Sequence, residues 1–345
     1  MNLLVPCAGR SSRFQTGAPK YLLSMPDGRL MFESAIAPLL GQAETVLFAI
    51  LREHEQSFGA SSIIKDLVPS SEVVILDEVT RGQAETVLLM AKHFGVKGAF
   101  LVKDPDSHFE PAETYNPTYN YVSVCSAREV RDVKLYNKSF AVINEQGYIV
   151  GMVEKEITSE CFSCGGYFFA DSESFIQSFE KYERLQIAGE FYLSHIIDLM
   201  IESGHVFHPM PCTKYEDWGT HEDWIAYRKR VGTYLIDLDG VIYQNGSRFW
   251  RPRWGENKVI EKAREKINGL FSRGNYIVII SSRPETLRAV TEAQLQRDHV
   301  RYHQLVLGVH HATRIAINDF SPTNPYPAVV AINTERDSGD FVDKV

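Results

Sequence analysis

A loop near the start of the chain combines small residues with cations, which are the residue types that bind phosphate. Residues 3–5 form an apolar run typical of a buried strand, and the loop that follows it contains Ala8, Gly9, Arg10 and Ser11. Gly9 lets the backbone approach a ligand closely, and consecutive N–H groups of such a loop can surround an anion. Arg13 and Lys20 add positive charge, one as a planar fork and one as a point charge. These residues favour the binding of a triphosphate.

Paired carboxylates follow two other apolar runs and suit phosphate chemistry. Asp104 and Asp106 come after one run, and their oxygens suit Mg²⁺, a hard cation. Asp237 and Asp239 end another run in the pattern Asp-x-Asp-Gly. Asp237 is placed to take up a phosphoryl group as a nucleophile, and Asp239 to protonate the leaving oxygen and later activate water.

Alternating strands and helices are expected to position these residues. Buried strands are predicted at 45–51, 73–76 and 99–102, and helices at 32–40 and 86–93. Such alternation is typical of a mostly parallel α/β sheet, in which ligands bind beyond the carboxyl ends of the strands. Further strands are predicted at 122–125, 140–143 and 148–150, and further helices at 189–201 and 222–230.

The strand pattern restarts at Gly232, which divides the chain into predicted domains 1–231 and 232–345. In the second domain, strands are predicted at 276–281 and 314–319. The segment between these strands has room for about one βα unit, too little for a folded cap. We therefore expect the site of the second domain to be open.

The composition describes an ordinary globular protein and excludes some function classes. The chain has 345 residues, enough for two cores, with 44% hydrophobic and 23% charged residues. A formal net charge of −8 argues against non-specific nucleic-acid binding and against attraction to a membrane surface. We recognise no signal peptide or membrane-spanning run, and five cysteines without framework spacing suggest reduced thiols in a cytoplasmic protein.

The first loop, closed by Pro19-Lys20, resembles the signature of the sugar-phosphate nucleotidyltransferases, also called nucleotide-sugar pyrophosphorylases. The resemblance covers about residues 1–230, and it implies a Rossmann-like nucleotidyltransferase fold with a mixed sheet. Further segments that resemble this family follow in the same order, at 81–86, 103–106, 154–155, 165–167, 189–193 and 216–220.

This resemblance implies roles for particular residues. It places Gly82 and Gln83 at the nucleobase, and Glu154, Lys155, Gly166 and Glu190 at the sugar phosphate. It makes Asp217 one Mg²⁺ ligand and leaves the other open, because strand-end alignment favours Asp104 while the residues around Asp106 resemble the family's Asp-Asn-x-Phe variant. Without the family, Glu154 and Lys155 form a solvated charged pair at a strand edge, and the turn at Asp217 suits a helix N-cap.

The second domain resembles the haloacid dehalogenase (HAD-like) superfamily of phosphatases. This resemblance implies that the domain has a small, capless Rossmannoid fold. The residues that carry this resemblance are Asp237, Asp239, Ser281, Ser282, Arg314 and Asp319. In that family, Ser281 would hydrogen-bond the phosphoryl group, and Asp319 would bind Mg²⁺ with Asp237 and the backbone carbonyl of Asp239. An open site would accept a bulky substrate or borrow a lid, so a homo-oligomer is one expectation.

The third motif of that superfamily normally supplies a lysine, and none is well placed here. Arg314 or His310 would have to replace it. The alternative to a phosphatase is therefore a catalytically silent module for binding or oligomerisation.

We expect a bifunctional, Mg²⁺-dependent enzyme. The first domain would transfer a nucleoside monophosphate from a nucleoside triphosphate to a phosphorylated sugar or polyol, with release of pyrophosphate. The second would hydrolyse a phosphomonoester through an aspartyl-phosphate. The pairing of these two activities in one chain suits the supply of nucleotide-activated precursors for surface polysaccharide. A further alternative makes the first domain a nucleotide-binding regulator without transfer. The sequence leaves the nucleobase open, because Gln83 can pair with more than one base.

Overall fold

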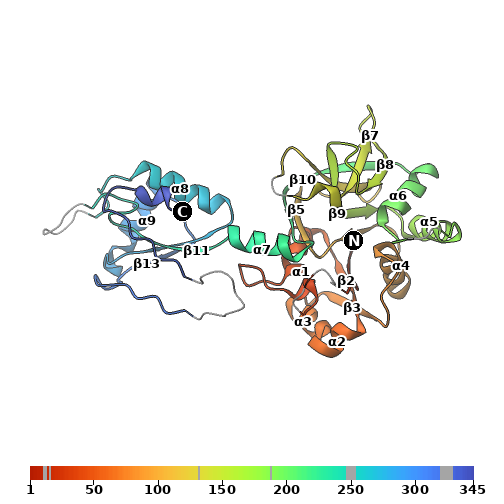
Figure 1. Cartoon of the computed structure of the whole chain (residues 1–345), viewed down its shortest axis with the longest axis horizontal. Helices are drawn as coiled ribbons and strands as arrows, with labels where there is room; N and C mark the ends of the chain where they lie inside the picture. Colours follow the sequence, from red (N-terminus) through yellow and green to blue (C-terminus); the bar gives the residue numbers. More distant parts are fainter. Residues whose placement is uncertain (11–13, 15–16, 131–132, 187–188, 246–253, 319–328) are drawn as a thin grey trace. The chain divides into compact units, whose positions relative to one another are not determined.

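The computed structural model describes the chain apart from residues 11–13, 15–16, 131–132, 187–188, 246–253 and 319–328 (Figure 1). The chain divides into two compact units, unit 1 at Met1–Tyr227 and unit 2 at Arg228–Val345. The boundary falls inside the helix α7 (His221–Arg230), whereas the sequence analysis places it between residues 231 and 232. None of the helices that the structure describes has the length and apolar character needed to span a bilayer.

Unit 1 is built on a mixed sheet with the strand order β3-β2-β1-β4-β9-β6-β10-β8-β7, and β5 pairs with β10. The strands are β1 (Asn2–Cys7), β2 (Thr45–Leu51), β3 (Ser71–Leu76), β4 (Phe100–Lys103), β5 (Ser107–Pro111), β6 (Asn120–Ser126), β7 (Ser139–Ile143), β8 (Ile149–Glu154), β9 (Cys161–Phe169) and β10 (Phe207–Asp217). The strands β1 to β4 pair in parallel, whereas β9 runs antiparallel to both β4 and β6. The predicted α/β class with a mixed sheet is confirmed.

Helices cover both faces of this sheet. They are α1 (Met31–Ile36), α2 (Arg52–Phe58), α3 (Ala60–Leu67), α4 (Gln83–Phe94), α5 (Ser172–Arg184) and α6 (Leu193–Glu202), with 3-10 turns at Lys20–Leu22, Ala37–Gln42 and Leu135–Asn137. The predicted helix 32–40 is therefore divided, since α1 ends at Ile36 and a 3-10 turn follows. Pro38 explains the break, because proline has no N–H to continue an α-helix.

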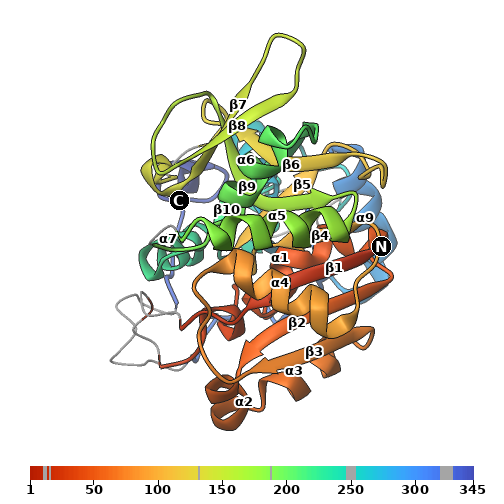
Figure 2. The same ribbon diagram turned by 90° about the vertical axis from the view of Figure 1, so that its right-hand side faces the viewer.

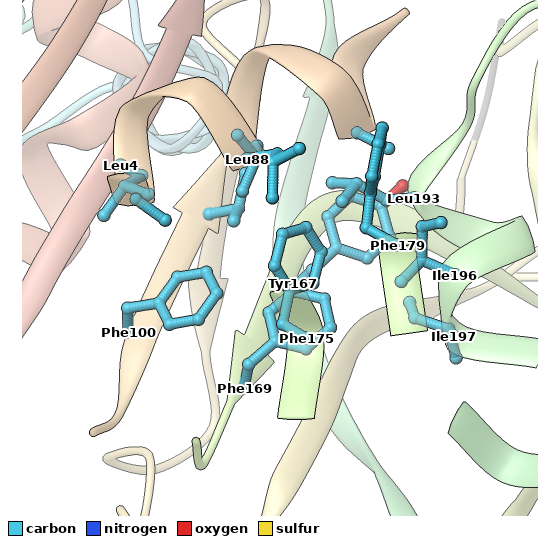
Figure 3. Close-up of a cluster of buried hydrophobic side chains, with 14 of the residues drawn as sticks. Leu4, Leu88, Phe100, Tyr167, Phe169, Phe175, Phe179, Leu193, Ile196 and Ile197 are labelled. Carbon is cyan, nitrogen blue, oxygen red and sulfur yellow. The ribbon is translucent and has the colours of Figure 1, made fainter. Parts of the chain in front are cut away.

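Alternation along the strands gives unit 1 a core on each side of the sheet. Leu4 packs on one face and its neighbours Leu3 and Val5 on the other. The helices α4, α5 and α6 gather over the Leu4 face (Figure 2), where a close-up shows aromatic side chains such as Phe100 and Phe175 packed together (Figure 3). The opposite face is covered by residues of α1 and α3. These cores hold the strand ends at fixed positions.

Unit 2 contains a parallel sheet in the order β11-β12-β13, flanked by helices. Its elements are β11 (Thr233–Asp237), α8 (Glu261–Ser272), β12 (Tyr276–Ile280), a 3-10 turn (Glu285–Leu287), α9 (Arg288–Arg297), β13 (Gln304–Val306) and a 3-10 turn (Asp340–Asp343). The prediction of a strand over 314–319 is wrong for its described part, since residues 314–318 contain no strand. Ile315 and Ile317 are 82% and 94% exposed. The alternating apolar pattern is not enough here, because a strand also needs a neighbour that pairs its backbone groups.

Candidate active site

Two cavities adjoin at the carboxyl ends of β1 and β4 in unit 1. One has a volume of about 480 Å³ and is lined by residues 6–10, Lys20 and the segment 79–86, and we call it the loop cavity. The other has a volume of about 370 Å³ and is lined by the open end of the β7–β8 hairpin, and we call it the hairpin cavity. The residues that line both are Gln83, Asp104, Asp106, Glu190 and Gly219. Ligands in the two cavities would therefore meet at these residues.

The described part of the first loop faces the loop cavity. Ala8, Gly9, Arg10 and Lys20 line it, whereas Ser11 and Arg13 lie outside the described residues. A Cβ added at Gly9 would meet no atom within 4 Å, so packing within the protein does not require glycine there. Any need for glycine at this position would come from the close approach of a ligand.

Asp104 and Asp106 contact different partners. Asp106 accepts a hydrogen bond from Nζ of Lys20, and Asp104 accepts one from Nε2 of Gln83. Burial, together with the charge of Asp106, raises the pKa of Asp104 above its ordinary value. Burial is the largest single influence on Asp106 and raises its pKa, but Lys20, Lys138 and Lys103 together outweigh it and hold the pKa of Asp106 below its ordinary value. Asp106 is therefore the more strongly ionised of the two.

Asp217 lies close to Asp106 because β5 and β10 are paired. Asp217 stands opposite Ser107 in that pairing, and the N–H of Trp218 donates to the carbonyl of Asp106 at 2.9 Å. A Cβ added at Gly219 would lie 3.2 Å from Oδ1 of Asp217 and 3.5 Å from Oδ2 of Asp106. Glycine thus keeps open a space that both carboxylates border. Of the two candidates that the sequence leaves open, Asp106 is the one beside Asp217.

The carboxylates at Gly219 fit Mg²⁺. Within the described ranges, no three His, Cys, Asp or Glu residues gather to hold a metal ion. Mg²⁺ does not need such a group, because it usually keeps several waters and binds one or two carboxylates together with phosphate oxygens. Asp106 and Asp217 offer two carboxylates beside an open space. These residues therefore suit Mg²⁺ that is also bound by a ligand's phosphates.

Lys155 is held at the open end of the β7–β8 hairpin by its backbone and by its side chain. It has a φ of 58°, which is uncommon for a residue other than glycine, and its N–H donates to the carbonyl of Lys138 at 2.9 Å. Its Nζ donates to the hydroxyl of Tyr192 at 2.5 Å, and that hydroxyl donates to Oε2 of Glu190 at 2.5 Å. The hydrogen bond from Lys155 to Tyr192 raises the pKa of Lys155. Lys155 therefore faces the hairpin cavity as a cation.

Glu154 and Gly166, both assigned to the sugar phosphate by the resemblance, have different surroundings. Glu154 lines the hairpin cavity, and its Oε1 accepts hydrogen bonds from the hydroxyls of Ser139 and Ser194. Gly166 lies within β9, where a Cβ would collide with the side chains of Ser123 and Phe109. Sheet packing explains the glycine at position 166, and its neighbours Gly165 and Tyr167 line the cavity.

Two lysines that the sequence analysis does not single out contact this site. Lys138 forms an ion pair with Asp217, with 2.6 Å between Nζ and Oδ2. Lys103 is fully buried, and its Nζ donates to the carbonyl of Asp104 at 2.6 Å and to the carbonyl and hydroxyl of Ser107 at 2.8 and 2.9 Å. Burial lowers the pKa of Lys103 to about 8. A lysine inside an apolar strand is a signal that could have identified Lys103, whereas no spacing pattern identifies Lys138.

The segment around Gly82 is paired with the segment around Phe191. The N–H of Phe191 donates to the carbonyl of Arg81 and the N–H of Ala84 donates to the carbonyl of Phe191, each at 3.0 Å. A Cβ added at Gly82 would lie 2.5 Å from backbone atoms of Phe191. Glycine is therefore required at position 82 by this close backbone approach. Gly82 and Gln83 line the loop cavity, and Glu190 lines both cavities.

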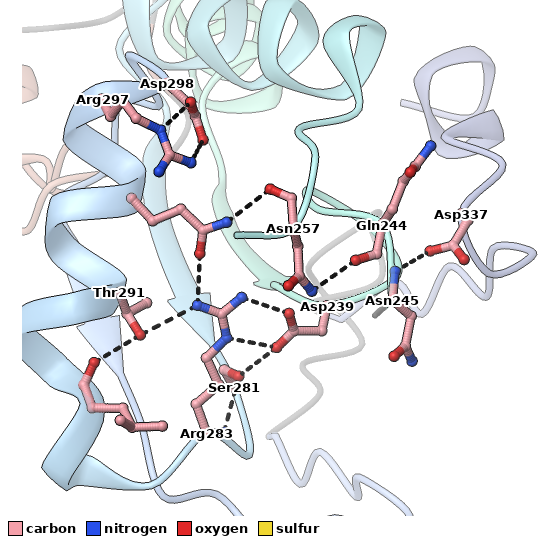
Figure 4. A network of polar contacts seen from close by, with 12 residues as sticks. Asp239, Gln244, Asn245, Asn257, Ser281, Arg283, Thr291, Arg297, Asp298 and Asp337 are labelled. Atoms are coloured by element: carbon pink, nitrogen blue, oxygen red, sulfur yellow. Dashed lines mark hydrogen bonds and ion pairs between the residues drawn. The ribbon is translucent and has the colours of Figure 1, made fainter. Parts of the chain in front are cut away.

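The predicted acidic pair of unit 2 is held by arginines. Asp239 forms a two-pronged ion pair with the fully buried Arg283, with Nη2–Oδ1 and Nε–Oδ2 distances of 2.7 and 2.9 Å (Figure 4). The hydroxyl of Ser281 donates to Asp239 at 3.3 Å, and Ser282 is half-buried beside it. Nη2 of Arg314 lies 2.8 Å from Oδ1 of Asp237. The predicted ligand Asp319 lies outside the described residues.

No family model and no curated protein sequence matches this chain. Several solved structures do. A nucleoside-diphosphate-sugar pyrophosphorylase from Vibrio cholerae RC9 is 22% identical, with a TM-score of 0.56, and the match covers 66% of this chain and 99% of that one. The inositol-1-phosphate CTP transferase from T. maritima is 16% identical, with a TM-score of 0.54, over 64% of this chain and 90% of that one. A UDP-glucose pyrophosphorylase complexed with UDP-glucose is 16% identical, with a TM-score of 0.52, over 66% of this chain and 98% of that one.

The matched share agrees with the size of unit 1, which holds 227 of the 345 residues. At this level of identity the likeness concerns the fold. The chain therefore has a mixed α/β fold with a nucleotidyltransferase-like core.

Proposed function

We propose that unit 1 is a nucleotidyltransferase that joins a nucleoside monophosphate to a phosphorylated sugar or a similar phosphorylated small molecule. The observation that carries this proposal is the meeting of the loop cavity and the hairpin cavity at Asp104 and Asp106. The loop cavity has the glycine turn and the lysine that a triphosphate requires. The hairpin cavity has lysines for a phosphate and carboxylates for hydroxyl groups. The three similar structures are a pyrophosphorylase of nucleoside-diphosphate sugars, a CTP transferase and a UDP-glucose pyrophosphorylase, and their names support the same chemistry.

In the proposed reaction, a phosphate oxygen of the acceptor forms a bond to the α-phosphorus of the triphosphate. The bond from that phosphorus to the bridging oxygen breaks, and pyrophosphate leaves with the electron pair. Lys20 and Arg13 stabilise the charge of the triphosphate, and Lys155 neutralises the acceptor phosphate so that the two anions can approach. Held by Asp106 and Asp217, with Asp104 nearby, Mg²⁺ would supply further positive charge to the phosphate oxygens. No protein nucleophile is needed.

The remaining site residues would select the two substrates. Gly82 lines the wall of the loop cavity against which a base would lie, while the backbone of Phe191 fills the place of its missing side chain. The amide of Gln83 can both donate to and accept from a base edge. Glu154 and Glu190 would accept hydrogen bonds from hydroxyl groups of the acceptor. Gly166 would act indirectly, because its small size lets β9 pack closely and places Tyr167 at the cavity.

The transferase proposal is tested by screening the four common nucleoside triphosphates against a panel of sugar 1-phosphates, with pyrophosphate release as the readout. We expect release with at least one pair, and we expect Lys20→Ala to reduce kcat by about a hundredfold or more while the fold is retained. Lys97→Ala is the matched control, because Lys97 is an exposed lysine of the same unit. Turnover of Lys20→Ala equal to that of the control would refute the role of Lys20.

For unit 2 we infer phosphomonoester hydrolysis, with Asp237 as the nucleophile and Ser281, Ser282 and Arg314 as phosphate-binding residues. Arg314, which contacts Asp237, would take the place of the lysine of the third motif. Asp319 would complete a Mg²⁺ site with Asp237 and Asp239. The two activities together would supply nucleotide-activated precursors of surface polysaccharide.

The ion pair of Asp239 favours a second candidate for unit 2. Both oxygens of Asp239 already accept hydrogen bonds from the buried Arg283, so this carboxylate is engaged by the protein itself. This contact suits a catalytically silent binding or oligomerisation module. Phosphate release from a panel of sugar phosphates, abolished by Asp237→Asn, would support the phosphatase. Equal release by the wild-type protein and Asp237→Asn would support the silent module.

A further inference from the structure

We propose that Lys138 binds the phosphate of the acceptor. When no ligand is bound, its ammonium group pairs with Asp217, the carboxylate that would otherwise bind the metal cation. The inference rests on the proposed function of unit 1. It adds to that function a substrate-binding residue and a competition between a lysine and a metal for one carboxylate.

The contacts of Lys138 place its ammonium group at the border of the hairpin cavity. Its Nζ lies 2.6 Å from Oδ2 of Asp217 and 5.5 Å from the ring centre of Tyr215. The side chains of Lys138 and Asp217 are 16% and 12% exposed, so the pair is largely shielded from water but open to the cavity. A partly shielded ion pair is stronger than an exposed one, because the effective dielectric is lower.

The carboxylates beside Gly219 are each neutralised by a different lysine. Lys20 contacts Asp106 and Lys138 contacts Asp217, so a cation already sits on each proposed ligand. A divalent cation that binds both carboxylates must displace Nζ of Lys138 from Oδ2 of Asp217 or share that oxygen with it. The displaced ammonium group then needs an anion, since an unpaired, shielded charge is costly.

The acceptor phosphate is the anion that the geometry offers. Lys138 ends the segment before β7 and Lys155 follows β8, and the N–H of Lys155 donates to the carbonyl of Lys138 at 2.9 Å. Both side chains line the hairpin cavity from the same open end of the hairpin. A phosphate monoester carries close to two negative charges at neutral pH, which one lysine cannot balance. Lys138 and Lys155, whose backbones are joined by this hydrogen bond, together supply two positive charges that match it.

Replacing Lys138 should therefore change two affinities in opposite directions. Lys138→Met removes the cation that competes for Asp217, so Mn²⁺, used as a probe for Mg²⁺, should bind about tenfold more tightly. The same variant loses one of two phosphate contacts, so inorganic phosphate should bind about tenfold more weakly to the metal-loaded protein. A purely structural role for Lys138 would weaken both affinities together.

The experiment measures Mn²⁺ binding by electron paramagnetic resonance and phosphate binding by calorimetry, on the full chain. Lys134→Met is the matched control, since Lys134 is a lysine of the same segment that pairs with Glu222 and Asp223 outside the two carboxylates. It should change both affinities by less than about twofold. Lys138→Arg should retain phosphate binding, and Lys138→Gln should repeat the result of Lys138→Met if the methionine variant folds poorly.

Unchanged or weaker Mn²⁺ binding in Lys138→Met and Lys138→Gln would overturn the competition, and unchanged phosphate binding would overturn the acceptor role. Neither measurement depends on turnover. If no triphosphate and acceptor pair reacts but the affinities shift as described, the proposed function fails and the phosphate site stands. If turnover is found and the affinities do not shift, only the inference on Lys138 fails.

Discussion

Removing the buried ammonium group of Lys103 should both destabilise unit 1 and misplace its aspartates. Lys103→Met leaves the carbonyl of Asp104 and the carbonyl and hydroxyl of Ser107 without the donor that joins them. Three hydrogen bonds from a charged donor are together worth roughly 6 kcal/mol, at about 2 kcal/mol each. Burial disfavours the cation by about 3 kcal/mol net of the attraction of Asp104 and Asp106, since its pKa is lowered from 10.5 to about 8. The expected loss of unfolding free energy is the difference, about 3 kcal/mol.

The assay is urea denaturation of a reference protein in which Trp250 and Trp254 are replaced by phenylalanine. The remaining tryptophans, Trp218 and Trp224, then report on unit 1 alone. Because Lys103 and Ser107 share a bond, we expect Lys103→Met and Ser107→Ala to be less than additive when combined. A loss below about 1 kcal/mol for Lys103→Met, or full additivity in the double variant, would refute this reasoning.

Three further substitutions test the packing and the charges of unit 1. Gly82→Ala should lower the unfolding free energy by about 1–3 kcal/mol and raise KM for the triphosphate, because its Cβ meets the backbone of Phe191; unchanged stability and KM would contradict this. Gly219→Ala should weaken Mn²⁺ binding severalfold while the melting temperature stays within about 2 °C, and unchanged binding would show that the space between the carboxylates is not a metal site. Burial raises the pKa of Asp198 from 3.8 to about 6, so the folded state holds more protons than the unfolded state between these values and stability falls as pH rises through them. Asp198→Asn keeps an acceptor for the N–H of Met152 and should remove this pH dependence. Above pH 6 the unfolding free energy of the variant should be higher by about 1 kcal/mol, after allowance for partial solvent exposure. Urea denaturation at pH 4 to 7 measures the slope, and an identical slope in the wild-type protein and the variant would disprove the assignment.

The sequence predicts the parallel part of unit 1 well because its strands are continuous apolar runs that end at polar residues. The runs at 45–51 and 73–76 become β2 and the carboxyl end of β3, and Asp104 follows β4 directly. Burial on both faces leaves such strands little freedom in sequence. Because the sequence locates these strands, it also locates their carboxyl ends, where the candidate site lies.

The contacts that join distant segments could not be predicted. Whether Asp104 or Asp106 stands beside Asp217 depends on the pairing of β5 with β10, for which the local sequence has no signal. Lys103 contradicts the rule that lysine is exposed, since its stabilising bonds come from a turn that only the folded chain shows. The strand predicted around Ile315 fails for a related reason, because an alternating pattern cannot show whether a pairing partner exists.

The backbone pairing of residues 81–84 with Phe191 joins the segment that we propose to contact the base to the segment that we propose to contact the acceptor. A graft of residues 80–84 from another enzyme would move the 189–193 segment, and with it Glu190 and the tyrosine that anchors Lys155. Any exchange of one segment should therefore include the other, so that both are replaced as one cassette.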